Sequence, residues 1–163
     1  MKASDLLVRC LEEEGIEYIF GVPGEENADF MLSLEASDKI RFVLTRHEQG
    51  AAFMAEVYGR LTGNPAGCLG TLGPGATNLI TGIANAFADK QPVLAITGEA
   101  PTHIFGKGGL QESSGEGGSF DQAMLFRHIT RYSKKVERTD YLPQVLLQAS
   151  KSLLSPAPGP VLL

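Results

Sequence analysis

The chain has 163 residues, 43% hydrophobic and 20% charged, which is typical of one globular domain with a continuous core. Its net charge of −5 at pH 7 gives no basic surface, so we expect neither nucleic acid nor an anionic membrane as a partner. No run reaches the roughly 18 apolar residues of a membrane span, and the N-terminus lacks a signal peptide's apolar segment, so we expect a cytoplasmic protein.

Apolar strand-like segments alternate with helical segments along the first hundred residues. The apolar spacing after Ser4 indicates a helix that Ser4 caps and Gly15 ends. The expected elements that follow are a strand over 16–22, a helix from 25, a strand over 40–44, a helix over 45–61, a strand over 66–72, a helix over 76–88 and a strand over 92–97.

The periodic pattern stops between residues 98 and 119, where six glycines predict a long mobile loop. Beyond it we expect a helix over 120–126, a strand over 129–136, a helix over 139–154 and a strand over 161–163. Alternation of this kind is typical of βαβ units. The fold class that we predict is α/β, a three-layer α/β/α arrangement with a mainly parallel central sheet in a single domain.

Three loops follow strands of this predicted sheet, and parallel sheets bind ligands beyond the carboxyl ends of their strands. The loops are Val22-Pro23-Gly24, residues 45–48 and Gly73-Pro74-Gly75, and we expect them to lie together. In the first, proline fixes φ and the glycine permits the positive φ of a turn. In the third, backbone N–H groups could face an anion, although the sequence is neither a P-loop nor a dinucleotide-binding fingerprint; a plain tight turn is the alternative.

Glu48 has two interpretations. With Thr45 it fits a capping box, in which Thr45 caps the helix and Glu48 reaches back to the backbone N–H of the cap. Alternatively, its carboxylate performs acid–base chemistry at the start of that helix. His47 between them is expected to be a neutral, partly buried side chain, not a metal ligand.

Small residues after Glu48 indicate close packing against one face of the same helix. Gly50, Ala51, Ala52 and Ala55 would admit a neighbouring helix, a second subunit or a flat ligand. Elsewhere we expect no metal site, because the two cysteines, Cys10 and Cys68, have no CxxC partner and no nearby histidine; both are expected to be reduced.

Four segments in order resemble the N-terminal, pyrimidine-binding domain of thiamine-diphosphate-dependent enzymes, within the acetolactate synthase-like group. The segments are residues 18–24 (YIFGVPG), 46–52 (RHEQGAA), 73–79 (GPGATNL) and 92–98 (PVLAITG). The resemblance covers the chain from Ala3 to Leu163. It weakens over residues 113–118, which replace the acidic and apolar residues usual on the substrate side, so the substrate stays open.

The resemblance implies a role for individual residues. Glu48 matches the glutamate whose carboxylate bonds N1′ of the aminopyrimidine, promoting the imino tautomer so that N4′ can remove the thiazolium C2 proton. Gln111 matches a glutamine near the reacting carbon, although Gln111 and Glu112 alone would be taken for solvated loop residues. The positions that line the pyrimidine ring correspond to Val22, Pro23, Gly24, Gly73, Pro74 and Asn78.

The resemblance also implies parts that this sequence lacks. In the family, Mg²⁺ holds the diphosphate at a Gly-Asp-Gly…Asn motif on another domain, and this chain has no such motif. Residues 1–163 are therefore expected to be an excised pyrimidine-binding domain, inactive alone, with the central and diphosphate-binding domains absent. The parent enzyme would be a homodimer or homotetramer that decarboxylates and joins 2-oxo acids such as pyruvate, with FAD as an option of the central domain.

Three alternatives stay open from the sequence. The chain could be a stand-alone pyrimidine-binding subunit of a two-chain 2-oxo acid decarboxylase. It could be a non-catalytic module that retains the fold, although Glu48 would then have no use beyond the cap. It could also bind a nucleotide through the Gly73 loop, which the absent third glycine of the fingerprint disfavours.

Overall fold

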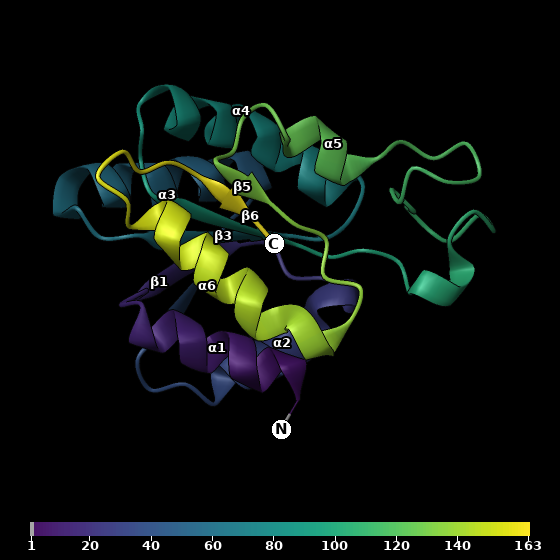
Figure 1. The fold of residues 1–163 in the computed structure, drawn as a ribbon, viewed down its shortest axis with the longest axis horizontal. Coiled ribbons are helices and arrows are strands. Elements are labelled where there is room, and N and C mark those ends of the chain that lie inside the picture. The colour runs from purple at the N-terminus through teal and green to yellow at the C-terminus, as the bar shows by residue number, and fades with distance from the viewer. Residues whose placement is uncertain (1) are drawn as a thin grey trace.

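The computed structural model describes residues 2–163 and shows a parallel sheet between two layers of helices (Figure 1). The six strands follow the order β2-β1-β3-β4-β6-β5, and every neighbouring pair is parallel. This confirms the predicted three-layer α/β/α fold. The strands are β1 (Tyr18–Gly21), β2 (Arg41–Leu44), β3 (Ala66–Gly70), β4 (Val93–Thr97), β5 (Tyr132–Ser133) and β6 (Val161–Leu162).

Two apolar clusters fill the two sides of the sheet. One joins the sheet to α1, α2 and α6, and the other joins it to α3, α4 and α5. In Figure 1, α1 and α2 lie at the bottom of the view, and α4 and α5 at the top. The helices are α1 (Ala3–Glu13), α2 (Ala28–Glu35), α3 (Glu48–Thr62), α4 (Pro74–Ala88), α5 (Gln122–Phe126) and α6 (Leu142–Leu153), with 3₁₀ turns η1 (Glu25–Asn27), η2 (Thr102–Ile104) and η3 (Thr139–Tyr141).

The central strand β4 shows why its sequence has no polar alternation. Leu94 and Ile96 belong to the cluster with α1, α2 and α6, whereas Val93 and Ala95 belong to the cluster with α3 and α4. Successive side chains of a strand point to opposite faces, and here both faces are covered by helices. A continuous apolar run is the result.

The ends of several elements differ from the predictions. Helix α1 begins at Ala3 with Lys2 as its N-cap, so Ser4 is not the cap; its hydroxyl accepts a hydrogen bond from Ser33 Oγ on α2, at 2.8 Å. Gly15 does follow the helix with a φ of 75°, as predicted. Strand β5 has two residues where eight were predicted, because it pairs only with the equally short β6.

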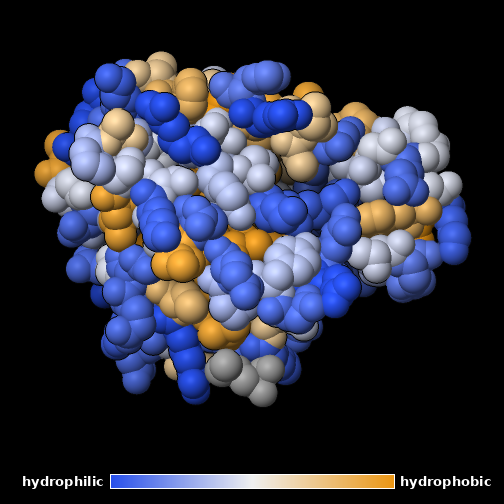
Figure 2. Space-filling model, viewed as in Figure 1, coloured by the Kyte–Doolittle hydropathy of each residue, from blue (hydrophilic) through white to orange (hydrophobic). Residues whose placement is uncertain are grey.

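Residues 98–119 contain no long helix and no paired strand, as predicted, but they are not simply solvated. They include η2 and an isolated antiparallel bridge between Ser114 and Asp121. Part of this segment projects from the body at the right of Figure 1, and the space-filling view shows it as a lobe with apolar atoms on its surface (Figure 2).

The last features of the fold are the state of the two cysteines and the apolar character of the helices. Both cysteines are free, and burial raises the pKa of the Cys10 and Cys68 thiols, which disfavours the thiolate form of each. Within residues 2–163, no helix combines the length and the apolar character that a membrane crossing requires.

Candidate functional site

The three loops predicted to meet do lie together. They follow β1, β2 and β3, which are neighbours in the sheet. A Cβ atom built on Gly24 would lie 2.2 Å from Thr71 Cγ2, and one built on Gly75 would lie 3.5 Å from Glu48 Oε1. The loop after β3 therefore contacts both of the other two.

The Glu48 carboxylate is nearly buried at the start of α3. Only 9% of the residue is exposed, and its Oε2 accepts a hydrogen bond from Asn78 Nδ2 at 2.9 Å. No hydrogen bond to Oε1 comes from residues 2–163. One carboxylate oxygen is thus oriented by Asn78, and the other remains available beside Gly75.

The capping-box interpretation of Glu48 is wrong. His47 is the N-cap, and its Nδ1 accepts from the Gln49 N–H at 3.2 Å, while Glu48 is the first helical residue. The Thr45 hydroxyl donates to the His47 carbonyl at 3.1 Å. The His47 side chain is exposed, not partly buried as predicted. Glu48 takes no part in capping. The positive end of the α3 dipole still stabilises the Glu48 carboxylate.

The small residues of α3 pack against α4. Ala51, Ala52 and Ala55 are fully buried, and a Cβ on Gly82 of α4 would lie 2.5 Å from Ala52 Cβ. Of the three occupants considered for this face, it is the neighbouring helix. Gly50 does not share it, because nothing lies within 4 Å of where its Cβ would be.

The loop after β3 forms a tight turn that leads directly into α4. Gly73 has φ 55° and ψ −114°, a conformation that favours glycine, and Pro74 begins the helix. The Thr77 hydroxyl bonds the Pro74 carbonyl at 3.1 Å, as the tight-turn interpretation predicted for Thr77 or Asn78. Asn78 instead reaches Glu48.

Gly24 is a glycine for a different reason from the one predicted. Its φ is −153°, which is extended backbone and not a positive φ. The place of its missing Cβ is filled by Thr71, and its N–H donates to Asn27 Oδ1 at 2.9 Å. Val22 before it donates its N–H to the Leu69 carbonyl, and Pro23 is exposed at the mouth of the site.

Gln111 lies against the Gly73 turn, although it is distant in sequence. Its own φ is 57°, and its carbonyl oxygen would be 2.7 Å from a Cβ on Gly73. The Gln111 side chain is exposed, whereas its neighbour Glu112 is buried, contrary to the prediction of a solvated pair. Hydrogen bonds from the Ser114 hydroxyl and from the Gly106 N–H lower the pKa of Glu112.

Two residues of the site were missed by sequence reasoning. The Gly73 N–H donates to both Ser113 Oγ and Gln122 Oε1, each at 3.2 Å. Ser113 was expected only as part of the mobile loop where the family resemblance weakens, and Gln122 was not singled out at all. No local pattern identifies either contact, because the partners are 40 and 49 residues apart.

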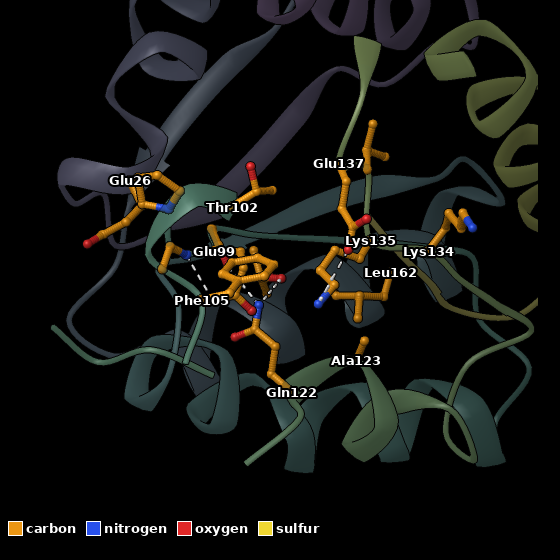
Figure 3. A pocket seen from close by; sticks show the side chains of 15 residues that line it. Glu26, Glu99, Thr102, Phe105, Gln122, Ala123, Lys134, Lys135, Glu137 and Leu162 are labelled. Atoms are coloured by element: carbon orange, nitrogen blue, oxygen red, sulfur yellow. Dashed lines mark hydrogen bonds and ion pairs between the residues drawn. The ribbon is translucent and has the colours of Figure 1, made fainter. Parts of the chain in front are cut away.

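A separate cavity opens at the carboxyl ends of β4 and β6, with Gln122 in its wall. Its volume is about 320 Å³, and Figure 3 shows Glu99, Phe105 and Lys135 around it. Glu99 Oε2 is a buried oxygen without a hydrogen-bond partner among residues 2–163. Among residues 2–163, no group of three or more His, Cys, Asp or Glu side chains could hold a metal ion.

Comparison with known proteins gives consistent matches. Residues 1–120 match the family described as "Thiamine pyrophosphate enzyme, N-terminal TPP binding domain". The chain is 39% identical over 161 residues to a "Probable acetolactate synthase large subunit" of Methanocaldococcus jannaschii, covering 99% of this chain and 26% of that protein. Identity to "Acetolactate synthase 3, chloroplastic" of Brassica napus is 40%, covering 99% of this chain and 24% of that protein. The chain thus spans about a quarter of the length of these relatives.

Proposed function

Because this chain belongs to the N-terminal TPP-binding domain family of thiamine pyrophosphate enzymes, we propose that Glu48 activates thiamine diphosphate bound at the three-loop site. The observation that supports this most directly is the free Oε1 of a carboxylate whose other oxygen is fixed by Asn78. A ring nitrogen of the cofactor could share a proton with this Oε1 atom.

The residues present fit the flat aminopyrimidine half of the cofactor. Gly24, Gly73 and Gly75 allow the loops to pack closely, because Thr71 or Gln111 occupies the place of each missing Cβ, and Gly75 lies beside Glu48 Oε1. Val22, Pro23, Pro74 and Asn78 would line the ring in this proposal. When bound, the cofactor supplies a thiazolium carbon that adds to the carbonyl of a 2-oxo acid after losing its proton.

In this mechanism the chain's residues hold and move one proton. Glu48 Oε1 would share it with N1′ of the pyrimidine, while the Asn78 amide keeps the carboxylate in place. The nearly dry surroundings strengthen that interaction. Gln111, which rests on the Gly73 turn, would face the substrate and contribute a polar group near the reacting carbon.

The experiment that tests this role is Glu48→Gln in the longer enzyme. We expect C2-proton exchange of bound thiamine diphosphate, followed by NMR, to slow by roughly 10²–10⁴-fold while the cofactor still binds. Glu13→Gln is the matched control. Glu13 is an exposed residue of α1 that pairs with Lys39 at 3.6 Å, and α1 lies on the opposite face of the sheet from α3. Near-normal exchange in a Glu48→Gln variant that binds the cofactor would show the role to be wrong.

The activity of the whole protein is also part of the proposal. Residues 1–163 would be the first domain of a cytoplasmic acetolactate synthase-like enzyme that decarboxylates and joins 2-oxo acids such as pyruvate. Separate domains would hold Mg²⁺ with the diphosphate, and FAD where present. The name acetolactate synthase that these relatives carry and their roughly fourfold greater length support the activity and the further domains. The intact mass from the native source tests it: a mass near 17.4 kDa would instead indicate a stand-alone pyrimidine-binding subunit.

We further propose that the enzyme is a homo-oligomer, a dimer or a tetramer. Met54, Val57 and Leu61 form an exposed apolar stripe on α3, the helix that begins with Glu48. This stripe supports the proposal, because a second copy of the chain could cover it next to the candidate site. Val57→Glu should shift the enzyme toward monomer in analytical ultracentrifugation. Leu147→Glu, on the equally exposed face of α6, should leave the state unchanged. If the two substitutions change the oligomeric state equally, the α3 stripe is not the interface.

A further inference from the structure

The side chain of Gln122 is buried and uses its whole amide. Only 5% of the residue is exposed. Its Oε1 accepts from the Gly73 N–H at 3.2 Å and from the Ser113 hydroxyl at 2.8 Å. Its Nε2 donates to the Gly98 carbonyl at 2.7 Å, with Thr97 Oγ1 at 3.4 Å. Two acceptor contacts and two donor contacts satisfy a primary amide fully.

These contacts join the exits of two neighbouring strands. Gly73 belongs to the turn after β3, and Gly98 follows β4 directly. The strand exits also contact each other, since the Gly98 N–H donates to the Gly70 carbonyl at 3.3 Å. In Figure 3, Gln122 rises from α5 with dashed lines to the backbone at the end of β4. The Gln122 amide therefore connects the Gly73 turn to the start of the 98–119 segment.

Contacts from this amide hold the Gly73 turn in addition to the glycine and proline of its own sequence. Its N–H has only Gln122 and Ser113 as acceptors within residues 2–163, while its carbonyl accepts from Thr77 at 2.9 Å. The Gln111 backbone lies against the same glycine. Loss of the Gln122 oxygen would remove one of these two acceptors from a buried N–H, and would leave the Ser113 hydroxyl without its own acceptor, which disfavours this conformation.

Neither the start nor the docking of α5 requires the Gln122 side chain. Asp121 caps α5, its Oδ1 accepting from the Met124 N–H at 3.0 Å. Phe126 is fully buried in the cluster with α3 and α4 and fixes the helix to the sheet. The polar contacts of Gln122 all lead instead to the loops around the candidate site.

We propose that Gln122 is a positioning residue: its amide holds the Gly73 turn and the 98–119 segment at a fixed separation, and so places Gln111 relative to Glu48. This inference rests on the proposed function. It assigns to α5 a part in forming the site, through a side chain that touches neither the pyrimidine nor the reacting carbon.

The test compares three variants in the longer enzyme. Gln122→Leu removes all four contacts at similar size, and Gln122→Glu keeps the acceptors for Gly73 and Ser113 while losing the donor to Gly98. Gln148→Leu on the exposed face of α6 is the matched control. The measurements are the dissociation constant of thiamine diphosphate by calorimetry, hydrogen exchange of peptides containing Gly73, and kcat with KM for pyruvate.

We expect Gln122→Leu to weaken cofactor binding by about tenfold and to speed exchange at Gly73. Gln122→Glu should restore cofactor affinity to within about threefold of the parent, with KM still raised because the 98–119 segment is loosened. A purely structural role would move stability in both variants without this split between cofactor affinity and KM.

Two results would overturn the inference. One is Gln122→Leu binding the cofactor as tightly as the parent. The other is Gln122→Glu losing cofactor affinity as fully as Gln122→Leu. Failure of the proposed function looks different, because the parent enzyme would then not bind thiamine diphosphate, or Glu48→Gln would leave C2-proton exchange intact.

Discussion

Asn78 Nδ2 donates a hydrogen bond to Glu48 Oε2 across 2.9 Å, joining the beginnings of α4 and α3. The two residues are 30 positions apart, and each belongs to a different loop-to-helix junction. Their contact exists because α3 and α4 pack closely through small residues. The orientation of the carboxylate is thus a property of the helix pair.

Asn78→Ala should lower the rate of C2-proton exchange by about tenfold, because Glu48 loses the donor that fixes its carboxylate. The measurement is the same NMR exchange experiment, in the longer enzyme with saturating thiamine diphosphate. Thr77→Ala is the matched control, since the Thr77 hydroxyl bonds only the Pro74 carbonyl within its own helix. Equal rates in the two variants would show that Asn78 does not orient Glu48.

Gly24→Ala should destabilise the chain by about 1–3 kcal/mol, since the new Cβ would overlap Thr71 Cγ2 at 2.2 Å. The steric explanation predicts a rescue: Thr71→Ser removes that methyl group, so the double variant should regain most of the lost stability. Urea unfolding of the four proteins measures this. Additive losses in the double variant would mean that the glycine is required for another reason.

Gly82→Ala should also be destabilising, by about 1–3 kcal/mol, despite the helix propensity that alanine adds. The new Cβ would lie 2.5 Å from Ala52 Cβ and would push α4 away from α3. Gly50→Ala is the matched helical glycine, with nothing within 4 Å of its Cβ, and should be stabilising by up to about 1 kcal/mol. Thermal unfolding distinguishes them, and a stabilising Gly82→Ala would contradict the packing of the two helices.

Acidification should loosen the segment around Glu112. Hydrogen bonds from the Ser114 hydroxyl and the Gly106 N–H lower the pKa of Glu112, so the folded segment favours the ionised carboxylate. Its stabilising effect is complete above the pKa of the unfolded chain, about 4.3, and is lost as pH falls through the lower pKa of the folded state. NMR shifts of the Gly106 and Gly109 amides should follow this titration. Glu112→Gln should abolish it, and an unchanged profile in that variant would refute the assignment.

The fold and the meeting of the three loops could be predicted because both follow from short-range pattern and sheet topology. The three-residue spacing of Thr45 and Glu48 could not decide between a cap and a catalytic acid, since it is the same in both. The choice depends on His47, whose extended φ of −161° makes it the N-cap, so that the helix begins at Glu48. A local pattern does not specify that angle.

Other features of the site lay beyond sequence reasoning for reasons of distance. A glycine required by a neighbouring side chain looks the same in sequence as one required by a positive φ, which is why Gly24 was explained wrongly. One of the two acceptors of the Gly73 N–H, Gln122 Oε1, lies 49 residues away on α5. Only the folded chain brings such partners together, and the buried state of Glu112 has the same origin.

The placement of β6 between β4 and β5 has a consequence for synthesis on the ribosome. Strands β1 to β4 can pair among themselves as soon as they leave the exit tunnel, because they are neighbours in the sheet. Strand β5 emerges next, yet within residues 2–163 it pairs with β6 alone, nearly 30 residues later. Until Val161 and Leu162 arrive, the apolar edge of β4 stays open and can pair with other nascent chains. The interval between β4 and β6 is therefore when this chain is most exposed to aggregation, and when a chaperone would matter most.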